Sequence, residues 1–312
     1  MAEVETKYRS YWVSFLIMWI PYIVIYIAGY YLFEYYSKSI QNDLIRLLVV
    51  DLIATVIVFI FSYIFDNSSI YDPYWMVPTI GLVLYLNEVS PNRNSLNSIL
   101  IMSPIIAYSI KHTVFYFRFW PGLKYEDFRY VEFSKKIKSK IIYWLFSFFG
   151  LHIMPTLMIY FAIIPTYYAL RIPESLYQTT QNQLYIYGGI VLSWLGLIFE
   201  TIADEQILPW RIKKSKEIIL AGLWKYSRHP NYFGDMFVWI GMFLPCLVYG
   251  EEYYWTSFGA ILILAIMNFY TLPAMERHLK SSRPEYAEYQ KHVSRMIPWF
   301  TTYTPTKDKK NK

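Results

Sequence analysis

Hydrophobic residues along this chain gather in long runs, separated by shorter segments that hold most of the charged residues. The first run, residues 11–33, contains no charge, and a helix of about 20 apolar residues crosses the roughly 30 Å hydrocarbon core of a bilayer. The same pattern recurs to give about eight spans, of which the third is the shortest: 11–33, 43–65, 73–88, 96–117, 141–169, 184–203, 232–249 and 254–274. The pattern predicts an all-α, polytopic membrane helical bundle.

The loops between these spans alternate between rich and poor in basic residues. Two loops carry most of them: Lys124, Arg129, Lys135, Lys136, Lys138 and Lys140 after the fourth span, and Arg211, Lys213, Lys214, Lys216, Lys225 and Arg228 after the sixth. Short basic loops stay on the cytoplasmic side of a membrane. We therefore expect both of these loops, and both the N and C termini, to be cytoplasmic.

Composition narrows the class of protein further. Hydrophobic residues make up 55% of the chain and charged residues 17%, which excludes an intrinsically disordered chain. Cys246 is the single cysteine, so no disulfide forms within the chain, and without a CxxC or HExxH motif we expect no metal site. The net charge of +6 is explained by basic loops that meet an anionic leaflet. The expected partner is the lipid bilayer; neither nucleic acid nor an obligate protein partner is implied.

We divide the chain into membrane anchor spans (1–66), a catalytic membrane domain (67–300) and a lysine-rich cytoplasmic tail (301–312). The tail ends in Lys309-Lys310-Asn311-Lys312, which has the form of a dilysine retrieval signal, although a solvated, surface-binding tail has the same composition. The expected location is the endoplasmic reticulum membrane in a eukaryote and the inner membrane in a bacterium.

Candidate chemistry begins in the sixth span, because ionisable groups inside apolar spans are costly and usually line a wet cavity. Glu200 and Asp204 are four residues apart and share a helical face, and Arg211 follows about two turns later. Pro209 would kink this helix and turn Arg211 elsewhere. The three residues predict either a ligand site or a salt-bridge cluster at the helix end.

The densest polar stretch is residues 222–235, GLWKYSRHPNYFGD, which joins the second basic loop to the seventh span. His229 precedes Pro230 and is biased to extended geometry, and residues 231–235 would open the next helix, so the free amides of its N-terminus would face what this loop surrounds. Lys225 and Arg228 suit phosphates, Asn231 offers bidentate hydrogen bonding, and Trp224, Tyr226 and Tyr232 offer flat surfaces. Together they suit a nucleotide, although an ordinary interfacial loop with aromatic belt residues has the same composition.

These residues also carry a family resemblance. The stretch 222–235, followed by Leu272-Pro273, Glu276-Arg277, Pro284-Glu285-Tyr286, Tyr289 and residues 294–299 (SRMIPW), resembles the C-terminal-domain superfamily of the steroid 5-alpha-reductases. Residues 69–78 (SIYDPYWMVP), 120–122 (WPG), 126–130 (EDFRY) and 199–206 (FETIADEQ) are similar to its branch of uncharacterised membrane oxidoreductase-like proteins. Phe128 and Asp235 stand where that branch usually has tryptophan and glutamate.

The resemblance implies a helical membrane fold whose cytoplasmic half holds NADPH and whose lipid-open pocket accepts a steroid-like or other lipid substrate. Glu200, Asp204 and Arg211 reproduce the spacing of residues that grip the nucleotide in the characterised reductases. Asn231 and Asp235 would hold the nicotinamide end. The remaining expected cofactor residues are Tyr226, Arg228, His229, Tyr232, Glu276 and Arg277.

Reduction of an enone also requires a donor at the carbonyl oxygen and a proton source. We take Tyr71 and the neighbouring Asp72 as candidate catalytic residues, with Trp75 one turn on as a wall for the substrate. The donor pair of the steroid reductases has no counterpart in this sequence. The acidic and basic residues at 126–130 fit either ribose and phosphate contacts or a loop ion-pair set.

Two other functions fit the same residues. The superfamily includes isoprenylcysteine and phospholipid methyltransferases, which use an Arg-His-Pro-x-Tyr element to bind S-adenosylmethionine, and this chain has that element at residues 228–232. The paired glutamates of those enzymes are replaced here by Glu276-Arg277. A non-catalytic sterol- or lipid-binding membrane protein would need only the aromatic-rich spans. The expected function is a reductase in lipid metabolism, with these two as alternatives.

Overall fold

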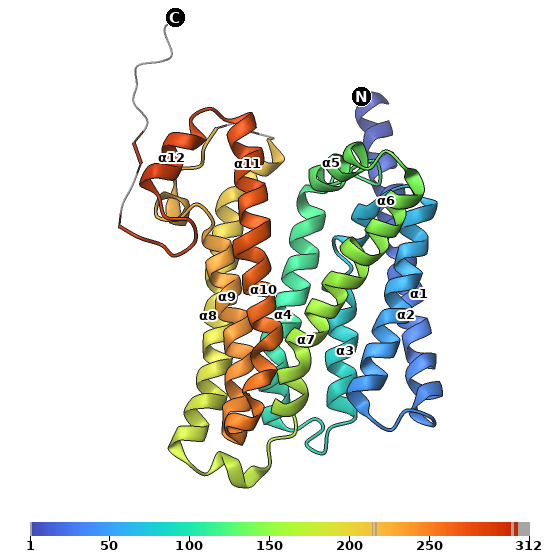
Figure 1. Ribbon diagram of the computed structural model, residues 1–312, viewed down its shortest axis with the longest axis vertical. Coiled ribbons are helices and arrows are strands. Elements are labelled where there is room, and N and C mark those ends of the chain that lie inside the picture. The colour runs from blue at the N-terminus through green and yellow to red at the C-terminus, as the bar shows by residue number, and fades with distance from the viewer. Residues whose placement is uncertain (1, 214, 216, 301–302, 305–312) are drawn as a thin grey trace, which may run out of the picture.

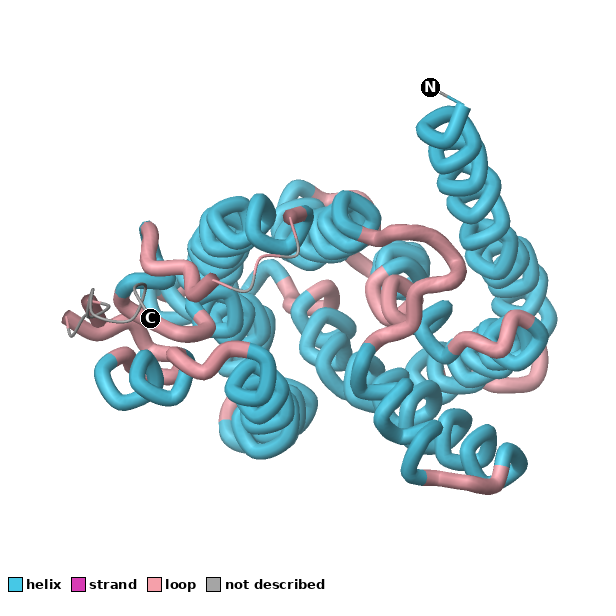
Figure 2. The backbone as a smooth tube through the Cα atoms, turned by 90° about the horizontal axis from the view of Figure 1, so that it is seen from above, coloured by secondary structure: helices cyan, strands magenta, loops and turns pink. Residues whose placement is uncertain are grey.

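The computed structural model describes residues 2–213, 215, 217–300 and 303–304, which form helices and no β-strand (Figure 1 and Figure 2). Seven helical segments are long and apolar enough to cross a membrane: Tyr11–Ser37, Asp43–Ile64, Leu96–Phe119, Lys140–Ala169, Thr180–Ile212, Pro230–Tyr249 and Glu251–Ser282. Large apolar side chains on these segments are exposed, among them Leu16, Ile27, Ile60, Leu195 and Ile261, as lipid contact requires. The predicted all-α, multi-pass membrane bundle is confirmed.

The helices have the following bounds. The long ones are α1 (Ala2–Ser37), α2 (Asp43–Ile64), α4 (Leu96–Phe119), α7 (Met154–Ala169), α8 (Thr180–Ile212) and α9 (Pro230–Phe243). The shorter α-helices are α3 (Val77–Glu88), α5 (Phe128–Lys136), α6 (Lys140–Phe146), α10 (Phe258–Ile266), α11 (Leu272–Ser282) and α12 (Tyr286–His292). Short 3₁₀ segments η1 (Ser68–Tyr71), η3 (Glu174–Tyr177), η4 (Gly222–Lys225), η5 (Leu244–Tyr249) and η6 (Glu251–Ser257) connect them, and π-helical η2 (Ser147–Ile153) and η7 (Met267–Thr271) interrupt two of the spans.

Polar residues fix where several of these helices begin. The Asn42 side chain accepts hydrogen bonds from the backbone amides of Leu44 and Ile45 at the start of α2. Ser95 caps α4 and Thr179 caps α8 in the same way, so amides that lack a partner within the helix are satisfied. These caps place the ends of the spans at the polar edges of the apolar runs.

The third predicted span is shorter than a membrane crossing. Helix α3 has 12 residues, and at 1.5 Å per residue it covers about 18 Å. The chain before it descends into the bundle as the turn η1 and the residues 72–76, because Pro73 and the buried polar contacts of Asn67 and Asp72 favour irregular backbone there. Non-helical backbone is tolerated at this depth where protein groups satisfy it. The result places residues 71–75 inside the bundle.

The described segments nearest the two ends of the chain lie at the same end of the bundle. Figure 1 shows the start of α1 beside α5 and α6, with α11 and α12 at the same end. The two basic loops follow α4 and α8 and therefore also lie there. For the described terminal segments, this arrangement agrees with the predicted shared location of termini and basic loops. Lys214, Lys216 and the lysine-rich tail from 305 onward lie outside the described residues.

Helices α8 and α9 pack more closely than any other pair of long helices, because glycines face one another along the contact. A Cβ atom added at Gly234 would lie 2.6 Å from the Gly196 carbonyl oxygen and 2.6 Å from the Glu200 nitrogen. Gly241 approaches Gly189 in the same way. This contact brings the polar N-terminal turn of α9 against Glu200.

The two π-helical segments lie on either side of the same interior space. Segment η2 lies between α6 and α7, and η7 lies between α10 and α11. Gly150 and Leu151 of η2 and Met267 and Tyr270 of η7 line one cavity. Wider turns of this kind recur at functional sites.

Candidate functional site

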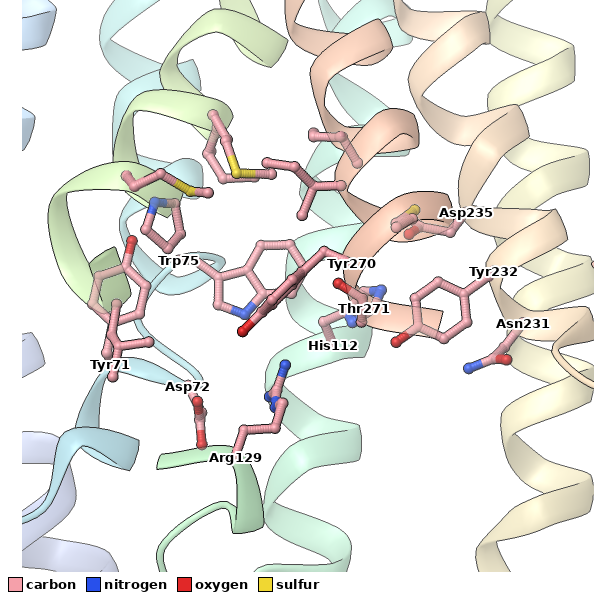
Figure 3. A pocket seen from close by; sticks show the side chains of 18 of the residues that line it. Tyr71, Asp72, Trp75, His112, Arg129, Asn231, Tyr232, Asp235, Tyr270 and Thr271 are labelled. Carbon is pink, nitrogen blue, oxygen red and sulfur yellow. The ribbon is translucent and has the colours of Figure 1, made fainter. Parts of the chain in front are cut away.

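The cavity at the centre of the bundle encloses about 400 Å³, within the usual range for a small-molecule site. Its walls come from the residues before α3 and from α4, α5, η2, α7, α8, α9, α10 and η7. One side is apolar and is formed mainly by Leu151, Met154, Pro155, Met158, Ile159, Ile263, Ile266 and Met267. The remaining lining is rich in ionisable and aromatic groups, so the cavity combines an apolar wall with a charged one (Figure 3).

The charged wall is built by α4 and α8. The Lys111 ammonium lies 3.0 Å from the Glu200 carboxylate and also donates to Asp204. His112 Nε2 lies 2.8 Å from Glu200 Oε1. Glu200 and Asp204 are buried one turn apart on α8, as their spacing predicts. The pair is therefore held by a cation from a neighbouring span.

The first turns of α9 complete this wall. The Asn231 amide donates to Asp204 at 3.3 Å. Asp235, one turn later, accepts from the Tyr108 hydroxyl and from the Trp239 indole N–H at 3.0 Å. Because Asn231 and Asp235 are four residues apart, both face the cavity across the glycine contact with α8.

Two buried side-chain oxygens in this wall lack a hydrogen-bond partner among the described residues. They are Oε2 of Glu200 and Oδ1 of Asn231, and both residues line the cavity. Buried polar atoms in folded proteins are almost always paired, and leaving one unpaired costs about 1–3 kcal/mol. The two atoms therefore favour a ligand that carries N–H or O–H donors.

The opposite side of the cavity holds Tyr71, Asp72 and Trp75, as Figure 3 shows. The Tyr71 hydroxyl is buried and hydrogen-bonds the Thr156 hydroxyl of α7 at 2.8 Å. Asp72 accepts from the Tyr130 hydroxyl at 2.7 Å. Burial, together with the neighbouring Asp127 carboxylate, raises the pKa of Asp72 to about 7. Asp72 can thus exchange a proton near neutral pH.

Two arginines stand at the basic end of the cavity. The Arg129 Nε donates to Asp127 at 2.7 Å, and Arg211 lies over the Phe115 and Phe119 rings at 5.3 and 5.0 Å. Both arginines line the cavity. A guanidinium pair of this kind is suited to phosphate oxygens.

The structure brings nine of the predicted site residues together around one cavity. They are Tyr71, Asp72, Trp75, Glu200, Asp204, Arg211, Asn231, Tyr232 and Asp235. Pro209 does not break α8, which continues to Ile212 and keeps Arg211 in line with Asp204. Tyr226, Arg228, His229, Glu276 and Arg277 were also predicted to bind the cofactor, but they do not line this cavity.

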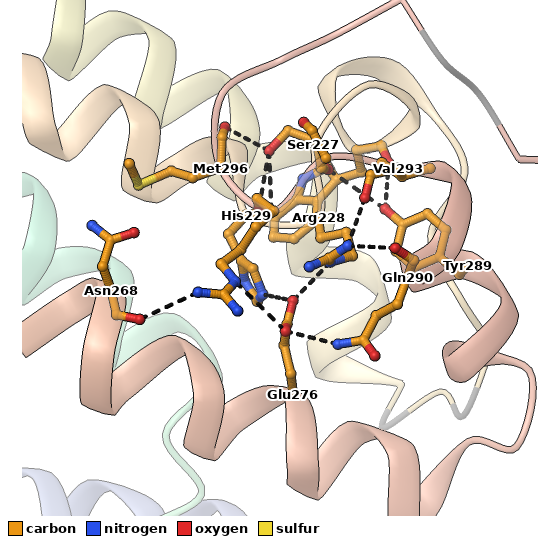
Figure 4. A network of polar contacts seen from close by, with 12 residues as sticks. Ser227, Arg228, His229, Asn268, Glu276, Tyr289, Gln290, Val293 and Met296 are labelled. Atoms are coloured by element: carbon orange, nitrogen blue, oxygen red, sulfur yellow. Dashed lines mark hydrogen bonds and ion pairs between the residues drawn. The ribbon is translucent and has the colours of Figure 1, made fainter.

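Arg228, His229 and Glu276 form a separate buried network (Figure 4). Glu276 Oε1 lies 2.7 Å from Arg228 Nε and 3.2 Å from His229 Nε2. Arg228 also donates to the carbonyls of Gln290 and Val293 at 2.8 and 2.6 Å. Burial lowers the pKa of His229. The network clamps the loop before α9 to α11 and to the chain around α12.

Tyr226 and Arg277 are on the outside of that clamp. The Tyr226 carbonyl accepts from the backbone amide of Trp299, and its side chain is 37% exposed. Arg277 is exposed on α11, next to the buried Glu276. Neither side chain reaches the cavity in this structure.

Sequence reasoning missed the contribution of α4, which supplies Tyr108, Lys111 and His112. Lys111 and His112 are ionisable residues in an apolar span, and that signal was present in the sequence. Tyr108 carried no such signal. The predicted set of site residues therefore lacked Lys111, the cation that pairs with Glu200.

His112, Glu200 and Asp235 also meet the geometric requirement for a metal ion. One ligand atom from each lies within 4.8 Å of the others. The Lys111 ammonium at 3.0 Å from Glu200 competes for the same carboxylate. The donor set is therefore balanced by a protein cation, and no motif in the sequence predicted a metal there.

Comparison with known proteins places the chain in a family. Residues 58–293 match the family described as "Protein of unknown function (DUF1295)". The chain belongs to this family. It is also 26% identical over 196 residues to an uncharacterised protein of Schizosaccharomyces pombe, C594.04c, and the match covers 55% of each chain. The chain thus matches about half the length of that curated relative. No solved structure matches the chain.

The family match begins within α2 and ends after α12, so it includes every residue of the cavity wall. Helix α1 lies before it and packs on α2. The cavity is therefore a feature of the part of the chain that defines the family.

Proposed function

We propose that this protein is an integral membrane reductase that uses NADPH to reduce a carbon–carbon double bond in a steroid-like or other lipid substrate. The proposal depends on one observation: Glu200, Asp204 and Asn231 face Tyr71 and Asp72 across a single cavity (Figure 3). The resemblance of the motifs to the steroid 5-alpha-reductase superfamily supports the same reaction class.

The charged wall fits a nicotinamide nucleotide. The unpaired acceptors Glu200 Oε2 and Asn231 Oδ1 suit the N–H groups of a carboxamide. Arg129 and Arg211 at the basic end suit the phosphates of the same molecule. NADPH, when bound, would supply hydride to the β carbon of an unsaturated carbonyl compound.

Residues of the chain itself would bind the substrate and donate the proton. The apolar wall formed by α7 and α10 favours a hydrophobic substrate and excludes water from the reacting bond. Tyr71 is a neutral hydroxyl donor that can hydrogen-bond a carbonyl oxygen, and Trp75 beside it offers a flat surface to a ring. Asp72, with its raised pKa, lies next to Tyr71 in the chain.

Cofactor binding to the detergent-purified protein tests the proposal without a known substrate. A thermal-shift titration with NADPH, NADH and S-adenosylmethionine would be run on the wild type, Asp204→Ala and Asn231→Ala. A ligand at about 100 times its Kd stabilises a protein by about 2.7 kcal/mol. Glu205→Ala is the matched control, because Glu205 follows Asp204 but pairs with Arg118 on the exposed side of α8.

We expect NADPH to stabilise the wild type and the control, and to lose most of this effect in the two cavity variants. Stabilisation by S-adenosylmethionine alone would favour a methyltransferase in place of the reductase. A folded protein that responds to none of the three would favour a lipid-binding protein. Localisation of a tagged full-length chain identifies the membrane in which the protein resides. In a eukaryote we expect the endoplasmic reticulum.

A further inference from the structure

A continuous line of hydroxyl groups crosses the interior of the bundle between α2 and the cavity. Tyr71 and Thr156 are 2.8 Å apart, and Thr156 and Thr55 are also 2.8 Å apart. Thr55 lies 3.0 Å from Tyr74, whose hydroxyl is 3.3 Å from the Asp51 carboxyl oxygen. All five side chains are buried. The line therefore links Asp51 to Tyr71 without passing through solvent.

Asp51 opens onto a second cavity, separate from the first. This cavity encloses about 660 Å³ between α1, α2 and α3. Its lining is mainly apolar but includes Asp51, Arg46 and the exposed carboxylates of Glu34 and Glu88. Glu34 is near the end of α1, Arg46 near the start of α2 and Glu88 at the end of α3, and Figure 1 shows these helix ends opposite α5 and α12. The second cavity thus has a polar mouth at the other end of the bundle.

Asp51 lacks the contacts that would explain it as a structural carboxylate. Among the described residues it forms no ion pair, and Tyr74 is its side-chain partner. The nearby Arg46 is already bound to Asp43, to the Ile40 carbonyl and to Tyr85. An ionisable residue in the middle of an apolar span is costly and is usually retained for function.

We propose that Asp51 supplies protons from the second cavity to Tyr71 through Tyr74, Thr55 and Thr156. The proposal rests on the proposed reductase function, in which each turnover consumes one proton. Each of the three intermediate hydroxyls lies within hydrogen-bonding distance of a neighbour on both sides along the line. The Thr55 hydroxyl also donates to the Asp51 backbone carbonyl at 2.9 Å, so its O–H must rotate toward Thr156 for each hydroxyl to accept one proton as it gives up another.

Atoms and electrons balance over one turnover. Hydride addition at the β carbon leaves an enolate, and Tyr71, placed at the carbonyl oxygen, gives that oxygen a proton, so that the enol O–H bond forms and the tyrosine O–H bond breaks. The enol then tautomerises to the saturated carbonyl compound with no net change in protons. Thr156, Thr55 and Tyr74 each pass one proton along the line, and the Asp51 carboxyl group gives the last one. Asp51 then takes a proton from water in the second cavity. The net uptake is one hydride from NADPH and one proton from solvent for each bond reduced.

Matched substitutions at Thr156 distinguish a loss of proton transfer from a loss of folded structure. Thr156→Val keeps the shape of the side chain but removes the hydroxyl, whereas Thr156→Ser keeps the hydroxyl. Asp51→Asn keeps the shape of the carboxyl group but cannot pass a proton. Each variant would carry 3-fluorotyrosine in place of Tyr71, and its fluorine resonance would be followed against pH in the full-length protein.

Other groups near the line also titrate or carry charge, and the comparison must remove them. They are Asp72, His152, Tyr74, Tyr160 and Arg46. All five groups are still present in Asp51→Asn, which differs from the wild type at residue 51 alone. The part of the fluorine titration that disappears in Asp51→Asn therefore reports on Asp51.

We expect that part to be smaller in Thr156→Val, where only the through-space charge of Asp51 acts on Tyr71, and to keep its wild-type size in Thr156→Ser. A titration that is the same in the wild type and Asp51→Asn, or that has the same size in Thr156→Val and Thr156→Ser, would overturn the relay. This readout needs neither cofactor nor substrate, so it is independent of the reductase test.

The second readout is the single-turnover rate of NADPH oxidation with a steroid enone in detergent micelles. We expect Thr156→Val and Asp51→Asn to lower this rate at least about tenfold, because proton transfer by a positioned group contributes about 10²–10⁴-fold. Thr156→Ser should restore most of it, and NADPH affinity should be unchanged in all three. An unchanged rate in Thr156→Val would reject the relay. If the fluorine resonance at residue 71 responds to Asp51 but the protein does not bind NADPH, the reductase function alone would be rejected.

Discussion

The ammonium group of Lys111 on α4 lies 3.0 Å from the carboxylate of Glu200 on α8; the two helices span the membrane, and the side chains are 13% and 3% exposed. Lys111 also donates to Asp204, so one cation compensates two carboxylates. Removing one partner of a buried ion pair leaves an uncompensated charge in a medium of low dielectric constant. Lys111 therefore allows the two carboxylates to be accommodated in the cavity wall.

Substitution of Lys111 by Met should destabilise the protein by about 3–5 kcal/mol, because Glu200 and Asp204 would lose their shared cation. Arg118→Ala removes another ion pair between the same two helices, but that pair is exposed and should contribute at most about 1 kcal/mol. Denaturant unfolding of the two variants in the same detergent compares them. Equal losses would show that the Lys111 pair contributes no more than a surface ion pair.

The close contact between α8 and α9 predicts an effect of added volume. Gly196→Ala would place its Cβ 2.5 Å from the Gly234 carbonyl oxygen, so the helices must separate, at a cost of about 1–3 kcal/mol. The separation would also move Asn231 away from Asp204 and weaken NADPH stabilisation. Gly188→Ala is the control, since its Cβ meets the end of Leu184 at 3.6 Å, an ordinary contact. The idea fails if both variants melt at the temperature of the wild type.

The raised pKa of Asp72 predicts a pH dependence of stability. The carboxyl group has its ordinary pKa of 3.8 in the unfolded chain and a pKa of about 7 in the fold, so the folded state binds the proton more tightly. Its contribution is fully present below pH 3.8 and is lost as the pH rises through about 7. Asp72→Asn should remove this component, so the stability difference between wild type and variant should change across that interval. A constant difference in melting temperature would contradict the shift.

The network around Glu276 should act on stability and leave the cofactor contacts in place. Glu276→Ala leaves Arg228 buried without its carboxylate and should cost about 3–5 kcal/mol. NADPH should still raise the melting temperature of the folded variant by the wild-type amount. Arg277→Ala, next to it and exposed, should change stability by less than about 0.5 kcal/mol. Loss of the NADPH response in either variant at unchanged stability would instead place that residue in the cofactor site.

The sequence was informative where a pattern extends over many residues. Seven of the predicted spans correspond to long helices because an apolar run of that length has few alternatives. The third run is not a full crossing, although residues 73–76 are as apolar as a span. The irregular backbone there follows from Pro73 and from the contacts of Asn67 and Asp72 with residues 123–130, which the apolar pattern does not reveal. Glu200, Asp204 and Arg211 were found together because helical periodicity fixes which residues share a face.

The direction of side chains in irregular segments could not be obtained from the sequence. Arg228 and His229 precede the first turn of α9 and point to Glu276, whereas Asn231 and Asp235 within the helix point to the cavity. These residues are contiguous in one motif, so their identities give no indication of the division. The contribution of Lys111 depends on the packing of α4 against α8, which no local pattern specifies.

The π-helical segment η2 places Thr156 on a particular side of its helix. A π turn contains an extra residue relative to an α turn, and one residue corresponds to a rotation of about 100°. The residues of α7 are therefore rotated about the axis relative to those of α6, so that Thr156 faces Tyr71 while Ile142 and Leu145 of α6 face outward. Deleting one residue from the segment would restore a regular helix and turn the Thr156 hydroxyl away from its partners. The phase of this one helix therefore decides whether the hydroxyls of α2 and η1 are joined or separated.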